Sequence, residues 1–447
     1  MPRIDDLLQP VLIKYRGKGV LIYDQESVKI DFDVVQLHNS EIFIYTATKD
    51  EKMMQMGFWD SYHDFKEIKG KTETNVVMSF KATGLQWVDF DLHVTTPECA
   101  VSWFAAEIEM ESELSDSKEK DYFLEAPLTN LRFTGNEKRI DESEHHFHSY
   151  SILSLNLSGA EVEIIPVEDY EKKLKIMHFT NVCTITSYLR VPCKDRLPQE
   201  QLVLLNNTCK LLSLAKGTIV SWPYYQILDK DGNIYRRYHR YTTMSSYNHL
   251  EVIHYSSMND LKTFLESTYQ LYTGLVINYD LRDIIDVIAL AKQIHILPEL
   301  RGLYVVSAID VLRGRWAKKH KRAYIFERNS FDKYKSIIKG HILKYLDETF
   351  DICDQQLGLV GKKIPELNRP AFRDQLKELI CDIDANLNDT DIDRFGRNRN
   401  DLVHEAHFDT DNVTEELMNI FYFADSLILA LLNYRGRYVD ARTGDFV

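Results

Sequence analysis

The 447-residue sequence has few cysteines, and no two of them form a C-x-x-C pair. The six are scattered along the chain: Cys99, Cys183, Cys193, Cys209, Cys353 and Cys381. Isolated thiols of this kind are typical of a reducing compartment, because disulfide frameworks and zinc sites need cysteines at closer and more regular spacing. The sequence therefore predicts neither a disulfide-rich secreted domain nor a cysteine-based zinc site.

Long hydrophobic runs are also absent. The two most apolar windows, residues 303–312 and 420–432, are short and contain Asp310 and Asp425. A membrane-spanning helix needs about 20 mostly apolar residues, so both windows predict core helices. Residues 1–6 are charged from the start, which is unlike a secretory signal. We therefore expect a soluble, cytoplasmic protein that does not contact a membrane.

The glycine-rich turns of several enzyme classes are missing as well. The sequence contains no G-x-x-x-x-G-K-[ST] loop, no G-x-G-x-x-G turn and no G-x-S-x-G elbow. Such turns bring backbone amides close to phosphates or expose a nucleophilic serine. Nucleotide hydrolysis and dinucleotide binding therefore lack support, and we expect no cofactor.

Positive charge is scarce overall. The chain carries 54 lysines and arginines against 68 aspartates and glutamates, a formal net charge of −14. This balance excludes a protein whose whole surface binds nucleic acid. It does not exclude a local basic cleft, because salt screens charges beyond about 10 Å.

The hydrophobic residues that are present suffice for folded cores, at 44% of the chain. From residue 20 to about 255 the pattern is strand-like, with β-branched and aromatic segments at residues 41–46, 75–80 and 85–94 and a predicted hairpin at 152–165. One helix is expected within residues 198–214. We predict a sandwich-like β-rich region of one or two subdomains over residues 1–255.

From residue 256 the apolar period changes to that of helices. The predicted helical runs are residues 261–272, 284–296, 300–319, 331–350, 371–383, 393–404 and 414–434. We therefore expect an α+β protein whose second domain, residues 256–447, is an all-α helical bundle.

The most informative stretch, residues 394–404, reads Arg-Phe-Gly-Arg-Asn-Arg-Asn-Asp-Leu-Val-His and precedes the last apolar helix. On a helix, Asn400 and His404 share a face because they are four residues apart, and Arg399 lies about 100° round from Asn400. An arginine can hold a phosphate through paired donors, and a histidine can move a proton near neutral pH. This combination suits phosphate chemistry.

The stretch resembles the motif of the HEPN superfamily, whose ribonucleases carry an arginine, a polar residue, a short spacer and a histidine. Arg399, Asn400 and His404 fit that pattern with four intervening residues, and Arg397 to His404 fits a looser version, so the choice between Arg397 and Arg399 stays open. A β-rich region followed by such a helical domain looks like the ApeA-type HEPN proteins of bacterial anti-phage defence.

The resemblance implies a metal-independent endoribonuclease with abortive-infection or toxin-like action. His404 would transfer the proton of a ribose 2′-hydroxyl, Arg399 would stabilise the phosphate, and Asn400 would orient the histidine or the substrate. It also implies a homodimer through the helical domain. The β-rich region would then sense a phage-derived trigger or regulator.

Two basic groups are candidates for RNA binding in this acidic chain. Arg394 and Arg397 flank the motif, and a second run contains Arg313, Arg315, Lys318 and Lys319 around Trp316. Such a run can follow an RNA backbone while the tryptophan stacks on a base. The alternative is a solvated helix end whose cations offset the helix dipole.

Three other segments are candidate sites. Residues 144–148, Glu-His-His-Phe-His, offer imidazoles for a metal, but a solvated loop or strand end after the polar, loop-like residues 136–143 is favoured. Residues 236–241 mix arginine with tyrosine, which favours a cross-strand aromatic ladder with exposed arginines over an RNA surface. Residues 404–407, His-Glu-Ala-His, resemble a shortened zinc-protease motif without a third ligand.

A non-catalytic alternative stands beside the nuclease. The helical domain can serve only to dimerise or bind RNA, with the β-rich region as the main binding surface. The two hypotheses differ in whether Arg399 and His404 converge in one water-accessible cleft.

Overall fold

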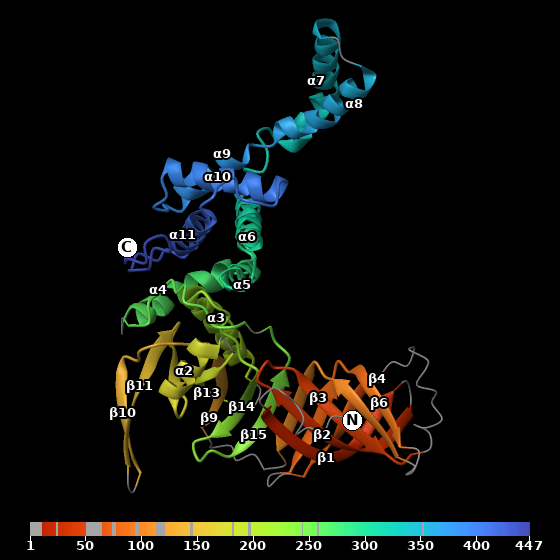
Figure 1. Cartoon of the computed structure of the whole chain (residues 1–447), viewed down its shortest axis with the longest axis vertical. Coiled ribbons are helices and arrows are strands. Elements are labelled where there is room, and N and C mark those ends of the chain that lie inside the picture. Colours follow the sequence, from red (N-terminus) through yellow and green to blue (C-terminus); the bar gives the residue numbers. More distant parts are fainter. Residues whose placement is uncertain are drawn as a thin grey trace. The chain divides into compact units, whose positions relative to one another are not determined.

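The computed structural model describes residues 11–23, 26–50, 65–73, 77–93, 98–112, 121–143, 146–180, 183–194, 198–243, 245–256, 259–350 and 353–447. The chain divides into two compact units, Met1–Gln270 and Leu271–Val447. The first is a large antiparallel sheet region and the second is helical, so the α+β prediction is confirmed (Figure 1). The boundary between the units falls inside one helix, α4 (Asp260–Leu275).

The described strands of the first unit form one continuous antiparallel series. They are β1 (Val11–Tyr23), β2 (Glu26–Leu37), β3 (Ile42–Thr48), β4 (Phe65–Thr72), β5 (Met78–Thr83), β6 (Gln86–His93), β7 (Glu98–Phe104), β8 (Glu107–Ser112), β9 (Tyr122–Thr129), β10 (Glu137–Ser143), β11 (His146–Leu157), β12 (Ala160–Pro166), β13 (Ile185–Cys193), β14 (Tyr224–Asp229) and β15 (Ile234–Arg240). Their spatial order is β10-β11-β12-β13-β9-β14-β15-β8-β5-β4-β1-β2-β3-β7-β6.

The strand predictions follow from alternation. In β3, every second residue from Ile42 is buried, and β5 alternates in the same way from Met78. The predicted hairpin is confirmed as β11–β12, where Leu157 pairs with Ala160. Ser158 and Gly159 between them have φ values of 54° and 87°, the positive-φ pair that a tight two-residue hairpin turn requires.

A buried histidine joins strands that are not neighbours in the sheet. His239 on β15 bonds Tyr15 of β1 through Nε2 at 3.2 Å and Gln36 of β2 through Nδ1 at 2.9 Å. The Gln36 amide nitrogen donates to backbone carbonyls, so its oxygen must accept from His239 Nδ1–H. Burial, and then the charge of Arg237, lower the pKa of His239 to about 3. The imidazole is therefore a neutral tie between strands of this curled sheet.

Two helices accompany the sheet within the first unit, α2 (Tyr170–Thr180) and α3 (Gln199–Lys216). The sequence predicted α3, which ends at Gly217 in the left-handed conformation. It did not predict α2.

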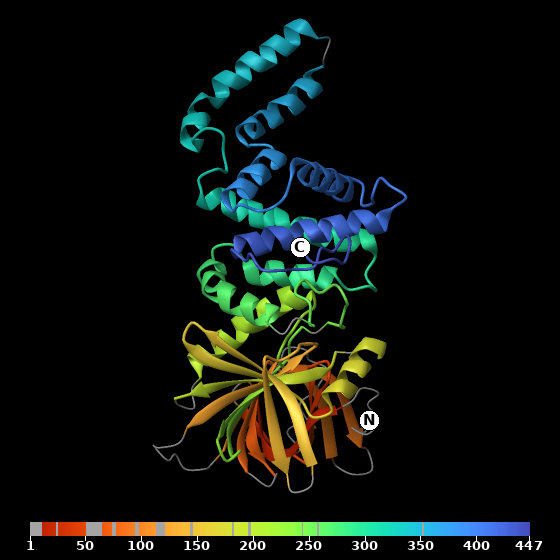
Figure 2. The ribbon, with the colours of Figure 1, turned by 90° about the vertical axis from the view of Figure 1, so that its left-hand side faces the viewer.

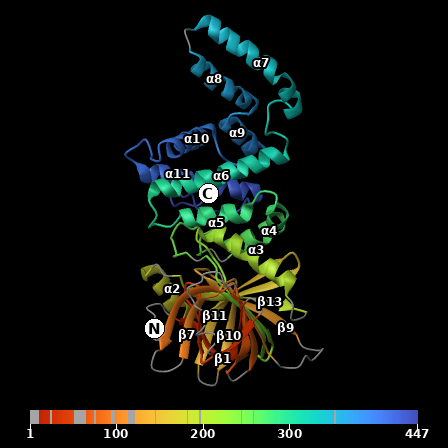
Figure 3. The same ribbon diagram turned by 90° about the vertical axis from the view of Figure 1, so that its right-hand side faces the viewer.

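The helical unit continues from the end of α4. Its elements are α5 (Leu281–Ala291), α6 (Pro298–Lys319), α7 (Arg328–Thr349), α8 (Asp354–Lys363), the 3₁₀ helix η2 (Ile364–Asn368), α9 (Phe372–Asp382), α10 (Asp389–His404) and α11 (Val413–Leu431). Helix α6 contacts α5, α9, α10 and α11, and is the centre of the bundle (Figure 3). Figure 2 shows α7 and α8 as a hairpin beside this bundle. The sequence did not predict α8.

The bundle core contains one fully buried ion pair. Lys292, which follows α5, donates to both carboxylate oxygens of Asp425 in α11 at 2.9 and 2.7 Å. Both side chains are at most 3% exposed. Burial raises the pKa of Asp425, and the lysine opposes that shift. Among the described residues, no helix combines the length and apolarity needed to cross a bilayer.

Two glycines of α6 allow a matched test of helix packing. A Cβ on Gly302 would lie 2.8 Å from Leu402 Cδ1 and 2.9 Å from Phe408 Cζ, whereas a Cβ on Gly314 meets nothing within 4 Å. Gly302→Ala should lower the free energy of unfolding by about 1–2 kcal/mol because it overpacks the contact with α10. Gly314→Ala should raise it by about 0.5–1 kcal/mol, since alanine favours helix.

The measurement is urea unfolding of the full chain, followed by helical circular dichroism. Equal shifts for the two variants would show that α6 does not depend on close approach at Gly302.

Candidate functional site

Helix α10 presents the Arg–His motif by burying one face and exposing the other. Asn388 caps the helix by accepting from the backbone N–H of Asp391, whose side chain accepts in return from the Asn388 N–H. The buried face consists of Ile392, Phe395, Asn398 and Leu402. This stripe leaves Arg397, Asn400 and His404 exposed.

Arg399 lies at the edge of the buried face and is held there by two contacts. Its guanidinium carbon is 4.8 Å from the ring centre of Phe372 in α9, and its Nη2 is 3.7 Å from Asp310 Oδ2 in α6. The side chain is 22% exposed. Its Nε is buried and has no hydrogen-bond partner among the described residues. A separation of 3.7 Å is longer than a hydrogen bond, so the guanidinium keeps free donor capacity.

Arg313 completes a cluster of two cations around one carboxylate. Asp310 Oδ1 accepts from Arg313 Nε at 3.0 Å and from Nη2 at 2.5 Å. Arg313 also donates to Gln375, and its guanidinium carbon is 5.0 Å from the Phe372 ring centre. Asp310 is therefore shared between Arg313 and Arg399, and Phe372 contacts both arginines. We call these four residues the Asp310 cluster.

Asn400 and His404 stand outside this cluster. Asn400 Oδ1 accepts from Arg399 Nη1 at 3.1 Å, which joins the first two motif residues. His404 ends α10 and is exposed, and in the described part of the chain no hydrogen bond or ion pair links it to Arg399. Arg399 and His404 project about 140° apart on the helix. A single chain therefore brings Arg399 to Asn400 but not to His404.

The end of α10 is locally acidic. Burial, together with the charges of Asp409 and Glu405, raises the pKa of Asp401. A phosphate that approaches His404 therefore needs positive charge, and the nearest cations on this helix are Arg397 and Arg399.

The two flanking arginines of the motif differ in their surroundings. Arg394 Nε donates to Glu416 Oε2 at 2.8 Å, and its Nη2 donates to Glu415 and Glu416 at 2.7 Å each. Asn398 donates to the same Glu416 oxygen. Arg397 is exposed and forms no ion pair among the described residues, so it is free to meet an anion while Arg394 joins α10 to α11.

The basic run at the end of α6 is partly engaged. Arg315 pairs with Asp280 at 2.5 Å, and Lys319 lies 4.7 Å from the ring centre of Tyr279. Lys318 and Lys319 are exposed. Trp316 is 3% exposed and donates to Asp382, so the expectation that its ring stacks on a base is wrong. The reason is that Trp316 continues the buried face of α6.

The two histidine-containing candidate segments, residues 144–148 and 404–407, form no metal site within the described part of the chain. Glu144 and His145 lie outside the described residues, and the preceding segment, predicted as a loop, is strand β10. The described residues contain no group of three or more potential metal ligands. Helix α10 ends at His404 and Ala406 has a φ of 57°, so residues 404–407 are not the helix that a zinc-protease motif requires.

The arginine–tyrosine strand forms the expected aromatic ladder but not the expected exposed arginines. Tyr238 of β15 stacks on Tyr225 of β14, with ring centres 5.4 Å apart. Arg236 lies 3.7 Å from Glu109 and 3.5 Å from Glu111, with its side chain 15% exposed. Arg236 is therefore largely neutralised within the sheet.

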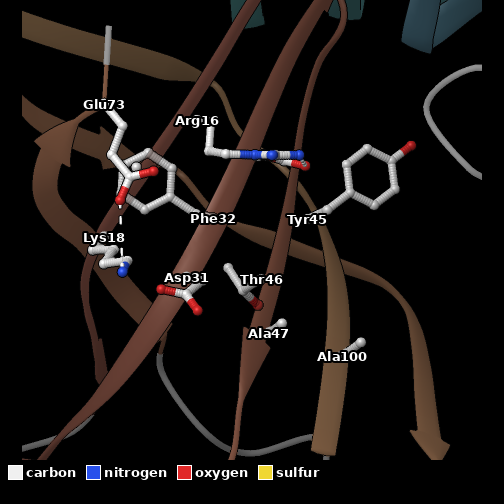
Figure 4. A pocket seen from close by; sticks show the side chains of 11 residues that line it. Arg16, Lys18, Asp31, Phe32, Tyr45, Thr46, Ala47, Glu73 and Ala100 are labelled. Atoms are coloured by element: carbon white, nitrogen blue, oxygen red, sulfur yellow. Dashed lines mark hydrogen bonds and ion pairs between the residues drawn. The ribbon is translucent and has the colours of Figure 1, made fainter.

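A cleft of about 430 Å³ opens on strands β1, β2, β3 and β7 (Figure 4). Its charges are mostly paired: Arg16 donates to both oxygens of Asp33, and Lys18 lies 3.7 Å from Glu73. Its lining contains none of the motif residues. The internal neutralisation makes this cleft a weaker candidate for a charged substrate than the Asp310 cluster.

Sequence reasoning missed two members of the Asp310 cluster. Asp310 stands out in the sequence only as a charge in an apolar window, although its i,i+3 spacing to Arg313 is a signal for a helical ion pair. Nothing in the sequence singles out Phe372. The arrangement can hold a phosphate beside Arg399 if an incoming oxygen competes with Asp310.

The Arg394 contacts predict a pH-dependent stability. Burial alone would raise the pKa of Glu416, but hydrogen bonds from Arg394 and Asn398 outweigh it, so this pKa lies below its ordinary value. The stabilisation is then complete above about pH 4.5, the unfolded value, and is lost as the pH falls through the lower folded value. Arg394→Ala should cost about 1–3 kcal/mol near neutral pH.

Urea unfolding at pH 7 and pH 3 tests this, with Arg397→Ala as the control on the same helix. Arg397→Ala should change stability by less than about 0.5 kcal/mol. A pH-independent loss for Arg394→Ala would contradict the role of Glu416.

Comparison of the chain with protein-family models, with curated proteins and with solved structures gives no match in any of the three. The site therefore rests on its own geometry and on the resemblance of residues 399–404 to the HEPN motif.

Proposed function

We propose that the protein is a metal-independent endoribonuclease of the HEPN type. The observation that carries the proposal is the fixed position of Arg399, packed on Phe372 and joined to Asn400, on the helix whose exposed end bears His404. Preorganised cations stabilise charge that develops in a transition state because they need not reorganise during reaction. A histidine is a residue suited to proton transfer near neutral pH.

The reaction proceeds by internal attack on the RNA backbone. His404 takes the proton from a ribose 2′-hydroxyl while O2′ forms a bond to the adjacent phosphorus. The bond from phosphorus to O5′ breaks, the leaving oxygen takes up a proton from water, and His404 returns its own proton to the solvent. Arg399 stabilises the negative charge on the phosphate oxygens, and Asn400 orients Arg399 or the substrate. The products are a 2′,3′-cyclic phosphate and a 5′-hydroxyl.

The separation of Arg399 from His404 favours a site assembled from two chains. Because the two side chains project about 140° apart on α10, an RNA phosphate held by Arg399 of one copy is better placed for His404 of a second copy. We propose that α10 and neighbouring surfaces of the helical unit form a homodimer. Exposed Arg397, with Lys318 and Lys319, would guide the RNA backbone.

The biological role proposed with this activity is defence against phage in the bacterial cytoplasm. The nuclease would act when the β-rich unit meets a phage-derived trigger. A second candidate is a non-catalytic module that dimerises or binds RNA. The observation that favours this second candidate is the absence of contact between Arg399 and His404 in one chain.

RNA cleavage in EDTA distinguishes the two functions. Wild type should yield cyclic-phosphate ends, and His404→Ala should lose about 10²–10⁴-fold in rate because proton transfer is removed. Arg399→Ala should lose activity as well, whereas Arg397→Ala should only weaken RNA binding. If Arg397→Ala alone abolishes cleavage, Arg397 is the catalytic arginine.

If wild type is silent on free RNA, the same variants are compared for protection of phage-infected cells. Protection that is equal for wild type, Arg399→Ala and His404→Ala would refute the nuclease and leave the non-catalytic module.

Mixing variants tests the two-chain site. Arg399→Ala and His404→Ala are each inactive alone, but a mixed dimer contains one intact pair, with Arg399 from one chain and His404 from the other. Mixing them in equal amounts should restore roughly a quarter of wild-type activity if subunits exchange freely. Native mass spectrometry confirms the mixed dimer, and a mixed dimer without activity would show that each site lies within one chain.

A further inference from the structure

A second cleft, of about 390 Å³, lies within the β-rich unit and has a different character from the first. It is lined by side chains of α2 together with Arg132, which follows β9, and His249. The volume falls in the range of small-molecule sites, about 300–1,000 Å³. None of its residues belongs to the Arg–His motif.

Two imidazoles meet in this cleft. The ring centres of His178 and His249 are 4.9 Å apart, and Tyr247 lies 4.9 Å from His178 and 5.2 Å from His249. His178 comes from the last turn of α2, and His249 from the segment that follows β15. Tertiary structure therefore joins histidines that lie 71 residues apart, as the difference 249 − 178 shows.

Arg132 supplies the fixed cation of the cleft. Its guanidinium carbon lies 3.2 Å from the ring centre of Tyr255, so the aromatic ring helps to hold the group in place. Among the described residues, no carboxylate forms an ion pair with Arg132. Lys175 of α2 adds a second permanent positive charge, and Glu171 is the one acidic residue of the lining.

A buried network behind the histidines prevents the nearest carboxylate from cancelling this charge. Tyr247 donates to Glu251 Oε1 at 3.0 Å, and Glu251 Oε2 accepts from the Tyr255 N–H at 2.9 Å. Lys216 Nζ is 3.4 Å from that same oxygen and donates to the Ile253 carbonyl at 3.0 Å. Lys216 is fully buried and Glu251 is 8% exposed. Glu251 is thus neutralised from inside the fold, and the network fixes Tyr247 beneath the imidazoles.

The rim of the cleft carries an unusual aromatic residue. Phe179 lines the opening and is 86% exposed, although a phenylalanine ring usually gains stability from burial. A planar ring beside two imidazoles can stack on a nucleobase.

We propose that this cleft binds a mononucleotide, with the phosphate against Arg132, Lys175 and the two histidines and the base stacked on Phe179. A metal ion is a poorer fit because the described residues offer no third ligand beside the imidazoles. Paired cationic donors and an exposed ring match the two halves of a nucleotide.

Binding is coupled to protonation. Burial, then the charges of Arg132 and His249, lower the pKa of His178, while Glu251 opposes them. A phosphate dianion placed against the ring favours its protonated form, so binding takes up a proton and strengthens as the pH falls from 8 to 7, a range in which the phosphate, with a second pKa of about 6, stays mostly dianionic. Glu171 and Lys175 on α2 and Tyr247 behind the rings are the other titratable groups facing the pair.

Isothermal titration of the full chain with AMP tests the site, with adenosine and inorganic phosphate as separate ligands. AMP should bind at least tenfold more tightly than either half, and more tightly at pH 7 than at pH 8. Absence of binding at millimolar AMP, or equal affinity for adenosine and AMP, would overturn the proposal.

Three variants sharpen the test. The double variant His178→Gln with His249→Gln should weaken AMP at least tenfold and remove the pH dependence. Phe179→Ala should weaken AMP binding but leave phosphate binding unchanged. Because the ring is exposed, its removal should not impair folding. Lys172→Gln, an exposed change on α2 outside the lining, is the control.

If Lys172→Gln weakens AMP as much as the double variant, the binding is non-specific and the proposal is wrong. Arg399→Ala and His404→Ala should bind AMP normally, so this site can fail or hold independently of the nuclease.

Discussion

The division of one carboxylate between two arginines is the interaction on which the motif depends. Asp310 binds Arg313 by short hydrogen bonds and Arg399 by a longer contact, so the two guanidinium groups are held unequally. Without Asp310, two cations on one aromatic ring would repel each other in a partly buried environment. The unequal division leaves Arg399 positioned and still able to receive a phosphate. An anion that binds Arg399 must compete with Asp310 for the guanidinium and displace that contact.

Helix α10 carries both an arginine that packs against a neighbouring helix and an arginine that stays exposed, and only their positions on the helix distinguish them. Arg394 and Asn398 face α11 and share Glu416, while the side chain of Arg397 stays in solvent. A helix turns 100° per residue, so three arginines within six positions necessarily point in different directions. Local sequence therefore groups residues that the fold assigns to different tasks. The position of each arginine relative to the buried stripe of α10 determines whether it packs against α11 or stays in solvent.

Periodicity was enough to predict the fold class and most helices, because burial of one face imposes a period of 2 on strands and 3.6 on helices. It failed for α8, whose sequence is polar and interrupted by Gly358 and Gly361, and which packs chiefly on α7 and η2. It also misjudged Trp316, although its spacing from Leu312 and Ile309 places it on the buried face of α6. Asp310 and Arg399 are 89 residues apart, as 399 − 310 shows, so their pairing is a property of tertiary structure that no local pattern contains.

Net charge says little about where this chain can bind an anion. At −14 the protein repels nucleic acid at long range, but salt screens that field within about 10 Å, so a site responds to its nearest groups. Positive potential arises where the fold leaves a cation without a carboxylate partner of its own. In the second cleft, Lys216 neutralises Glu251 from inside the fold. In the Asp310 cluster, one carboxylate is shared between two arginines. In both places a buried or shared acid leaves one arginine with unfilled capacity, and that local imbalance, more than the total charge, determines where a phosphate can be held.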